Sequence, residues 1–415
     1  MDRVRPNIGR LKSDIERIST FIDKSKLGHT RRSFTEEYKE ARVWLREKME
    51  ESGLETSIDA AANIIGRLSG SDNSLKPIII GSHTDTVENG GMYDGTIGVL
   101  GGIEVVRILK ENGVNLRHPL EIVDFTSEEP SEFGLSTIGS KGMIGELTKE
   151  MLQRRDNCGR VLSDAIHDLG GNSRSIKKLA RKKGDAVLYL ELHNELGPVL
   201  DNKECPLGVV TGIVGIHRYK VIVNGEANHA GTTPMNMRCD ALVFTSKLVL
   251  KLQSLCKDKN RDDVVGTVGK LNVEPNASNV IPGKCEFEFE VRSLQNDIID
   301  EIVSQFIDEA QALSKERNIK VKFDNISKSS SVIIDEGIKK VLKDSCEEVA
   351  KTMYLPSGAG HDANHINEIA PVGMIFVPSK DGKSHCPEEY TSYEEIEIGV
   401  HALIKALLAF DKILK

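Results

Sequence analysis

The stretch Pro77-Ile78-Ile79-Ile80-Gly81-Ser82-His83-Thr84-Asp85 decides the fold, because an apolar run leads directly into polar residues. Three consecutive isoleucines are typical of a strand that is buried on both faces, as in a parallel sheet covered by helices. A glycine-rich turn follows, and then an apolar segment from about residue 97 to 112 that predicts a helix. This order of strand and helix indicates an α/β layer.

The same alternation continues on both sides of this stretch. Residues 33–52 predict a helix, which Gly53 ends. A further helix is predicted over 335–350, and further strands are predicted over 63–68, 120–125, 186–192 and 372–377. Buried strands separated by helices favour a large domain with a mostly parallel sheet flanked by helices.

From about Gly212 the pattern changes. Strands are predicted over 218–224, 264–273, 280–293 and 319–326, and helices over 238–256 and 297–315. This order, β-α-β-β-α-β, is a ferredoxin-like unit. We therefore predict that residues 212–329 form a small domain inserted into a large one made of 1–211 and 330–415. Two domains also suit a chain of 415 residues, which is long for one core.

Composition excludes several classes of function. The net charge of −8 indicates no overall attraction to nucleic acid or to anionic membranes. No segment approaches the roughly 18 apolar residues of a membrane span, and the start of the chain lacks the apolar core of a signal peptide. The seven cysteines form no C-x-x-C pair, which favours reduced thiols. We expect a cytoplasmic protein that binds neither nucleic acid nor membrane.

Candidate metal ligands follow the predicted strands. His83 and Asp85 would point to the same side if the strand continued, so we expect the Asp85 carboxylate to orient the imidazole of His83. Asp94 follows a pair of glycines and precedes the helix that begins near residue 97. Taken alone, Asp94 is better explained as the N-cap of that helix.

Four further candidates lie at the ends of three other strands. Glu128 and Glu129 follow the strand at 120–125, His193 follows the strand at 186–192, and His385 follows the strand at 372–377. Adjacent carboxylates repel, and a nearby cation would let one of them bind metal while the other acts as a base. The carboxyl ends of the strands in an α/β sheet form one edge, where ligands bind. Imidazole and carboxylate ligands suit Zn, Mn, Ni or Co.

These motifs resemble the amidohydrolase branch of the dinuclear-metal aminoacylase/carboxypeptidase superfamily. The branch includes N-carbamoyl-L-amino acid hydrolases (hydantoinase-carbamoylase type), allantoate and ureidoglycolate amidohydrolases and β-ureidopropionases. The resemblance covers nearly the whole chain. The segments that carry it are Gly81–Val87, Asp94-Gly95, Ser127-Glu128-Glu129, Glu191-Leu192-His193, His229-Ala230-Gly231-Thr232-Thr233-Pro234-Met235, Asn279–Gly283, Ser357–Ala363 and Ser384-His385. The run from His229 to Met235 is particular to this branch, as is His193, where the peptidase branch usually has aspartate.

The resemblance implies a site with two divalent metal ions. His83 and His193 would hold the first ion, Glu129 and His385 would hold the second, and Asp94 would bridge them. Glu128 would be the free base. The inserted domain would be a lid that also forms a homodimer.

The resemblance also implies the residues that bind substrate. His229 and Asn276 would bind the substrate or stabilise its reacting oxygen, Arg292 would bind its carboxylate, and Gly358 would contact it. The structural alternatives are a surface strand arginine for Arg292 and turn residues for His229 and Asn276. Leu196 departs from the family, which usually has glutamine there, so the exact substrate stays open. Cys386 draws attention only because it follows His385.

We expect the chain to hydrolyse the ureido C–N bond of an N-carbamoyl-L-amino acid, releasing ammonia, carbon dioxide and the amino acid. Hydrolysis of allantoate or ureidoglycolate is the first alternative, because the chemistry is the same. Hydrolysis of N-acyl amino acids or peptides is a further alternative. A catalytically inactive protein that binds a small molecule is the alternative from a different class.

Overall fold

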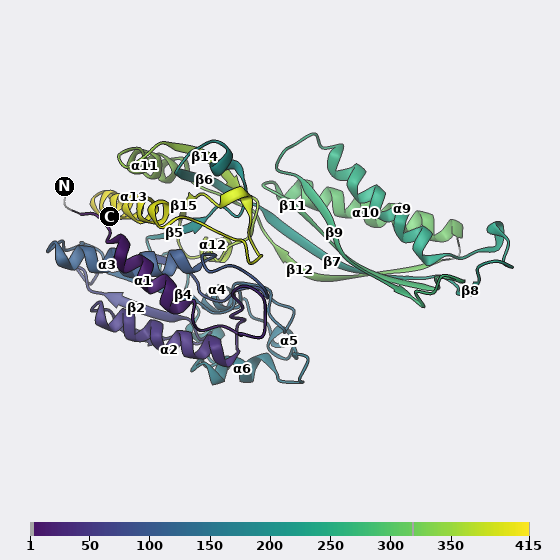
Figure 1. Ribbon diagram of the computed structural model, residues 1–415, viewed down its shortest axis with the longest axis horizontal. Coiled ribbons are helices and arrows are strands. Elements are labelled where there is room, and N and C mark those ends of the chain that lie inside the picture. The colour runs from purple at the N-terminus through teal and green to yellow at the C-terminus, as the bar shows by residue number, and fades with distance from the viewer. Residues whose placement is uncertain (1–3, 318, 415) are drawn as a thin grey trace. The chain divides into compact units, whose positions relative to one another are not determined.

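The computed structural model describes residues 4–317 and 319–414, and the chain divides into two compact units (Figure 1). The first unit comprises Met1–Thr211 and Ile334–Lys415, and the second comprises Gly212–Ile333. The small domain was predicted to end at residue 329, whereas the second unit also includes the short strand β13 (Val332–Ile333). That strand pairs with the last residues of β6 (Leu207–Ile213).

The first unit is built on one sheet whose four central strands run parallel. These strands are β4 (Leu120–Phe125), β3 (Ile78–His83), β5 (Leu188–Asn194) and β15 (Val372–Val377), in that order across the sheet. Every residue of the four strands is buried. Complete burial explains why these segments are almost continuously apolar in sequence. The predicted α/β layer is confirmed.

Strands on both sides of this parallel centre run antiparallel to their neighbours. On one side, β4 pairs with β2 (Ile64–Leu68), which pairs with β1 (Glu55–Ile58). On the other side, β15 pairs with β6 (Leu207–Ile213), which also pairs with β14 (Thr352–Ser357). The sheet is therefore parallel at its centre and antiparallel at its edges.

Helices cover the sheet, and the most deeply buried is α3 (Thr96–Glu111). It packs between the central strands and the helices α1 (Ile8–Ile18) and α13 (Tyr393–Ile413). Gly98 permits this close approach, because a Cβ there would lie 2.4 Å from the carbonyl oxygen of Leu192. The start of α3 is therefore held against the carboxyl ends of the strands.

The first unit contains further helices. The longer ones are α2 (Glu36–Glu51), which contacts β1 and β2, and α11 (Glu336–Glu347), which packs on α13. The shorter ones are α4 (Ile138–Met143), α5 (Lys149–Leu152), α6 (Leu162–Asp168), α7 (Ile176–Leu179), α8 (Val199–Asn202) and α12 (Ala363–Ile366). Within residues 4–317 and 319–414, no helix combines the length and the apolar character that a membrane span needs.

The second unit contains a four-stranded antiparallel sheet in the order β12-β7-β11-β9. Its elements are β7 (Gly215–Asn224), α9 (Ala241–Lys257), β9 (Val265–Glu274), β11 (Lys284–Ser293), α10 (Asn296–Arg317) and β12 (Lys320–Ser329). Alternate residues of β11 are buried under α9 and α10, which lie along one face (Figure 1). A short pair, β8 (Asn228–His229) and β10 (Val280–Ile281), completes the unit. The predicted order β-α-β-β-α-β is the order observed.

One predicted strand of this unit is divided. Residues 280–293 were predicted as a single strand, but Pro282 and Gly283 separate β10 from β11. Proline has no N–H to donate to a neighbouring strand, and glycine has no side chain to pack on one. Here the strand-breaking residues Pro282 and Gly283 outweighed the alternation of apolar and polar residues that predicted one strand.

Candidate metal centre

The five predicted metal ligands come from the carboxyl ends of the four parallel strands and from the start of α3. His83 is the last residue of β3, and His193 lies in β5, one residue before its end. Glu129 follows β4, His385 follows β15, and Asp94 precedes α3. The parallel order of the strands therefore brings together residues that are far apart in sequence.

The side chains of these residues form two groups that share Asp94. In the first group, Asp94 Oδ1 lies 3.8 Å from His83 Nε2 and 3.3 Å from His193 Nε2. In the second group, His385 Nε2 lies 3.1 Å from Asp94 Oδ2 and 3.0 Å from Glu129 Oε1. Asp94 thus directs one carboxylate oxygen to each group, which is the arrangement of a bridging ligand.

The protonation of the two buried histidines fits a cation. His83 Nδ1 lies 3.0 Å from the carbonyl oxygen of Asp85, and His193 Nδ1 lies 2.8 Å from that of Asn194. A carbonyl only accepts, so each Nδ1 carries a proton, and in the neutral imidazole each Nε2 directs a lone pair toward Asp94. His193 Nε2 is buried and has no hydrogen-bond partner among the described residues. A lone pair that faces a carboxylate is unfavourable unless a cation lies between them.

The electrostatics of the group agree with this assignment. Burial lowers the pKa of His83 to about 4, so its imidazole is neutral and able to bind metal. Hydrogen bonds to the Asp94 and Glu129 carboxylates raise the pKa of His385 to about 11. In the metal-free chain a proton on His385 thus supplies the positive charge that the two carboxylates require. Divalent metal ions of the kind that imidazole and carboxylate bind fit this set of donors.

Glu128 lies beside the metal groups without belonging to either. Its Oε2 is 3.8 Å from His83 Nε2, and its side chain is 12% exposed. Burial raises its pKa well above the ordinary value, and the neighbouring Glu129 and Asp362 raise it further. A carboxylate in these surroundings takes up a proton readily, as a general base requires.

Asp85 has a different contact from the one we expected. Strand β3 ends at His83, so Asp85 lies beyond it, and the Asp85 carbonyl is the group that hydrogen-bonds to the imidazole. The Asp85 carboxylate is 3.7 Å from His83 Nδ1 and instead accepts the backbone N–H groups of Glu128 and Glu129, at 3.1 and 3.2 Å. The buried carboxylate therefore fixes the loop that carries the candidate base and one metal ligand.

Three residues around the candidate metal centre have positive φ values, which residues other than glycine rarely adopt. Ser127, Leu196 and His385 have φ values of 56°, 60° and 55°. Residues held in the left-handed region cost free energy and collect at functional sites. His385 is itself a candidate ligand, and Ser127 directly precedes Glu128 and Glu129.

Two site residues were not predicted as such from the sequence. Glu389 is buried and accepts the backbone N–H groups of Tyr93 and Asp94. His361 packs its ring edge-on against His193, with 4.7 Å between the ring centroids. Glu389 belongs to a pair of adjacent acids near a candidate ligand, as Glu129 does, and that pattern could have identified it.

A third group of possible ligands is less suited to a metal ion. It consists of Glu191, His193 and His361. Ser82 and Tyr189 donate to the two oxygens of Glu191, at 3.0 and 2.8 Å. His361 Nε2 lies 2.8 Å from the hydroxyl oxygen of Ser357. Since Glu191 and His361 already have partners, the orphaned atom of this group is His193 Nε2, which also belongs to the first group.

Two predicted substrate-binding residues lie in the first unit. Leu196 follows β5, and its N–H donates to the Ser379 hydroxyl at 3.0 Å. Gly358 is exposed and follows β14. Leu196 is two positions beyond Asn194, the last residue of β5, so it lies near the strand end that carries His193.

The other three predicted residues belong to the second unit. Arg292 lies on the face of β11 that is not covered by the helices, and its Nε donates to Glu290 at 2.9 Å. Asn276 is exposed, with φ of 55°, a conformation that asparagine tolerates in turns. His229 is exposed on β8, and its Nδ1 accepts the N–H groups of Gly231 and Thr232, at 2.9 and 3.1 Å. His229 Nε2 must therefore carry the ring proton.

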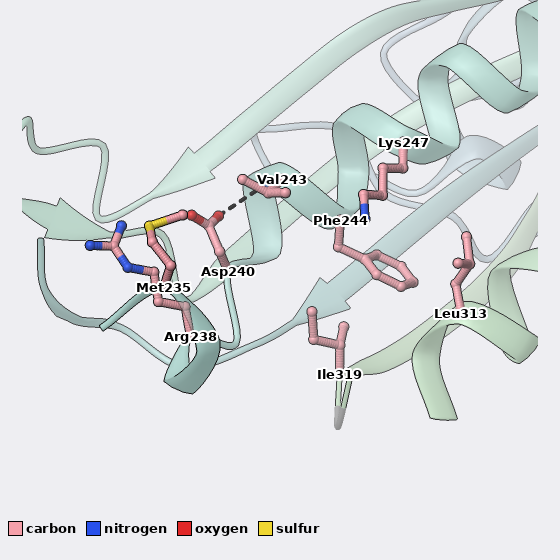
Figure 2. Close-up of a pocket in the computed structure, with 8 residues that line it drawn as sticks. All are labelled: Met235, Arg238, Asp240, Val243, Phe244, Lys247, Leu313 and Ile319. Carbon is pink, nitrogen blue, oxygen red and sulfur yellow. Dashed lines mark hydrogen bonds between the residues drawn. The ribbon is translucent and has the colours of Figure 1, made fainter. Parts of the chain in front are cut away.

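The loop that follows His229 is anchored by Arg238. Its guanidinium donates to the carbonyl oxygens of Thr233 and Ala230, at 3.0 and 2.6 Å. Figure 2 shows Arg238 beside Met235 and Asp240, at a small pocket in front of α9. Asp240 caps α9 by accepting the N–H groups of its first turn. The loop conformation that fixes the His229 tautomer is thus stabilised by Arg238 and by the capped start of α9.

Comparisons with known proteins agree with this geometry. The pattern of the peptidase family M20/M25/M40 matches residues 79–409. An N-carbamoyl-L-amino acid amidohydrolase of Geobacillus stearothermophilus is 38% identical over 91% of this chain and 92% of its own. An allantoate amidohydrolase of Bacillus subtilis (strain 168) is 36% identical, with 92% of both chains covered.

The solved structures give the same result. The crystal structure of an amidase of the hydantoinase/carbamoylase family from Burkholderia multivorans superposes with a TM-score of 0.86 over 98% of both chains, at 29% identity. The predicted resemblance is confirmed by these relatives and by the family match. The chain therefore belongs to the peptidase family M20/M25/M40, and within it is a hydrolase of non-peptide C–N bonds in linear amides.

Proposed function

We propose that the chain hydrolyses the ureido C–N bond of an N-carbamoyl-L-amino acid, with two divalent metal ions (Zn, Mn, Ni or Co) in each subunit. The products are ammonia, carbon dioxide and the free amino acid. The observation that carries the proposal is the placement of Asp94, which directs one oxygen to each ligand group, with Glu128 beside them. His83 and His193 hold the first ion, and Glu129 and His385 hold the second.

The proposed mechanism assigns proton transfer to Glu128. When bound, metal ions at these ligands would supply Lewis acidity toward water and the substrate carbonyl. Glu128 takes the proton from the attacking water and gives it to the leaving nitrogen. Burial among other acids suits the first step, because it makes Glu128 a stronger base than an exposed glutamate. Asp85 keeps Glu128 in place through the backbone of the loop.

His229 is proposed to stabilise the reacting oxygen. Because its Nδ1 accepts two backbone N–H groups, the proton on Nε2 is available to donate. A donor already oriented before the reaction stabilises developing negative charge without reorganisation. Asn276 would assist as a second donor.

Arg292 is proposed to bind the substrate carboxylate. Its planar guanidinium matches a carboxylate, and exchange of its contact with Glu290 would release it for that purpose. Gly358 and Leu196 would contact the rest of the substrate. Leucine cannot form the hydrogen bond that glutamine forms at this position in related enzymes, so a less polar substrate is favoured over allantoate.

A substrate panel with Mn²⁺ or Zn²⁺ tests the proposed function. We expect ammonia release to be fastest from N-carbamoyl-L-amino acids, with kcat/KM at least about tenfold above allantoate, ureidoglycolate and N-acyl amino acids, a difference of about 1.4 kcal/mol. Faster turnover of allantoate or ureidoglycolate would replace the proposal with that alternative. No turnover of any substrate by the metal-loaded protein would indicate a binding protein.

A homodimer through the second unit is proposed as well. The edge strand β9 leaves one side of its backbone unpaired within the unit, and it exposes Val265 and Leu271. Helix α9 exposes Val243 and Leu250. Analytical ultracentrifugation should give twice the mass of the chain, and Leu271→Lys should shift the equilibrium toward monomer. A wild-type protein that stays monomeric at micromolar concentration would contradict this.

A further inference from the structure

Glu389 is a buried carboxylate that neither metal group includes. Only 5% of the residue is exposed. Its Oε1 accepts the backbone N–H groups of Tyr93 and Asp94, at 3.1 and 3.0 Å, and its Oε2 accepts the Ser384 hydroxyl at 3.3 Å. A buried charge is costly unless it is hydrogen-bonded, so three donors aimed at one carboxylate indicate a built arrangement.

The contacts of Glu389 join two of the three segments that carry ligands of the second group. Tyr93 and Asp94 belong to the turn before α3, and Ser384 directly precedes His385. Asp94 and His385 are also in contact with each other, at 3.1 Å. One side chain therefore fixes the backbone of the bridging ligand and the residue next to a second ligand.

The turn before α3 is shaped to receive this side chain. A Cβ built on Gly91 would lie 2.3 Å from Glu389 Oε1 and 2.4 Å from Glu389 Cβ. Atoms cannot approach so closely, so any side chain at Gly91 would displace Glu389. Gly91 thus leaves the space that Glu389 occupies. Its backbone conformation is one that other residues can adopt, so the need for glycine is steric.

We infer that Glu389 is a positioning residue for the metal ion held by Asp94, Glu129 and His385. It acts by fixing the Asp94 backbone and the segment of Ser384 and His385 at the separation that a shared ion requires. The inference rests on the proposed metal centre, and it adds a residue that itself touches neither ion nor substrate. Partners of this kind orient metal ligands, and their loss costs on the order of 10–100-fold in metal affinity.

Metal titration of the full-length, metal-free protein tests this inference without an activity assay. Isothermal titration with Mn²⁺ should show two binding steps for the wild type. In Glu389→Ala one of the steps should weaken by about 10–100-fold while the other is kept. Glu389→Gln should restore it, because an amide oxygen can accept both N–H groups and the amide nitrogen can face the Ser384 oxygen. Glu388→Ala, which removes the exposed neighbouring carboxylate, should match the wild type.

Gly91→Ala provides a second variant if Glu389→Ala does not fold. It keeps the carboxylate but displaces it, so it should weaken the same binding step. Unchanged titrations in Gly91→Ala and Glu389→Ala would overturn the inference, and so would equal weakening in Glu389→Gln. A wild type that binds no metal would overturn both the inference and the metal centre. A wild type that binds two ions but cleaves no ureido substrate would overturn the proposed function alone.

Discussion

The Glu128→Gln variant should bind both metal ions and the substrate but lose turnover by about 10²–10⁴-fold. Glutamine has nearly the shape of glutamate, and its amide cannot accept a proton from water at neutral pH. The Glu128 backbone N–H, which holds the loop on Asp85, is unchanged. Steady-state kinetics should therefore show a fall in kcat with KM altered much less. Metal content can be measured on the same preparation by elemental analysis.

Two matched variants distinguish a specific role of Glu128 from the general effect of removing a negative charge. One removes a charge at the adjacent residue, and the other removes a charge at an exposed residue nearby. Glu129→Gln alters the adjacent residue, whose Oε1 lies 3.0 Å from His385 Nε2, and it should lower metal content together with activity. Glu132→Gln alters an exposed glutamate a few residues later and should leave both unchanged. If Glu128→Gln retained turnover, Glu128 would not be the base. If it lost metal as Glu129→Gln does, Glu128 would be a ligand instead.

The sequence could bring the candidate metal ligands together because their positions follow from regular structure. Parallel strands such as β3 and β5 are continuous apolar runs, and their carboxyl ends share one edge of the sheet. The proximity of His83 and His193 could therefore be predicted from the sequence. The ferredoxin-like order of the second unit also followed from periodicity. In both cases the decisive information lay within a few neighbouring residues.

The sequence could not predict contacts that depend on where a loop turns. Asp85 was expected to face the imidazole because the strand was extended through it, but β3 ends at His83. Glu389 binds the N–H of Asp94 across 295 positions, and no local pattern records such a pair. The left-handed backbone of His385 likewise depends on the surrounding fold, since nothing in histidine itself favours it.

Asp94 should be the ligand whose loss has the widest effect. The Asp94→Ala variant removes both carboxylate oxygens, one facing His193 and the other facing His385. We expect neither ion to bind at stoichiometric concentration and kcat/KM to fall by about 10⁴-fold or more, because each ion supplies several kcal/mol of transition-state stabilisation. His385→Ala should instead weaken only one of the two binding steps. Elemental analysis and titration with Mn²⁺ distinguish the two outcomes.

The thermal stability of Asp94→Ala tests the same assignment independently of activity. Ligands that bind only the folded state raise Tm, so the metal-free wild type should gain several degrees when Mn²⁺ is added. Asp94→Ala should gain almost nothing from Mn²⁺. Its metal-free Tm should fall slightly, because protonated His385 loses one of its two carboxylate partners. The surface variant Asp72→Ala should respond as the wild type does. A full metal-induced rise in Asp94→Ala would show that the ions bind without this residue, and the bridging assignment would then fail.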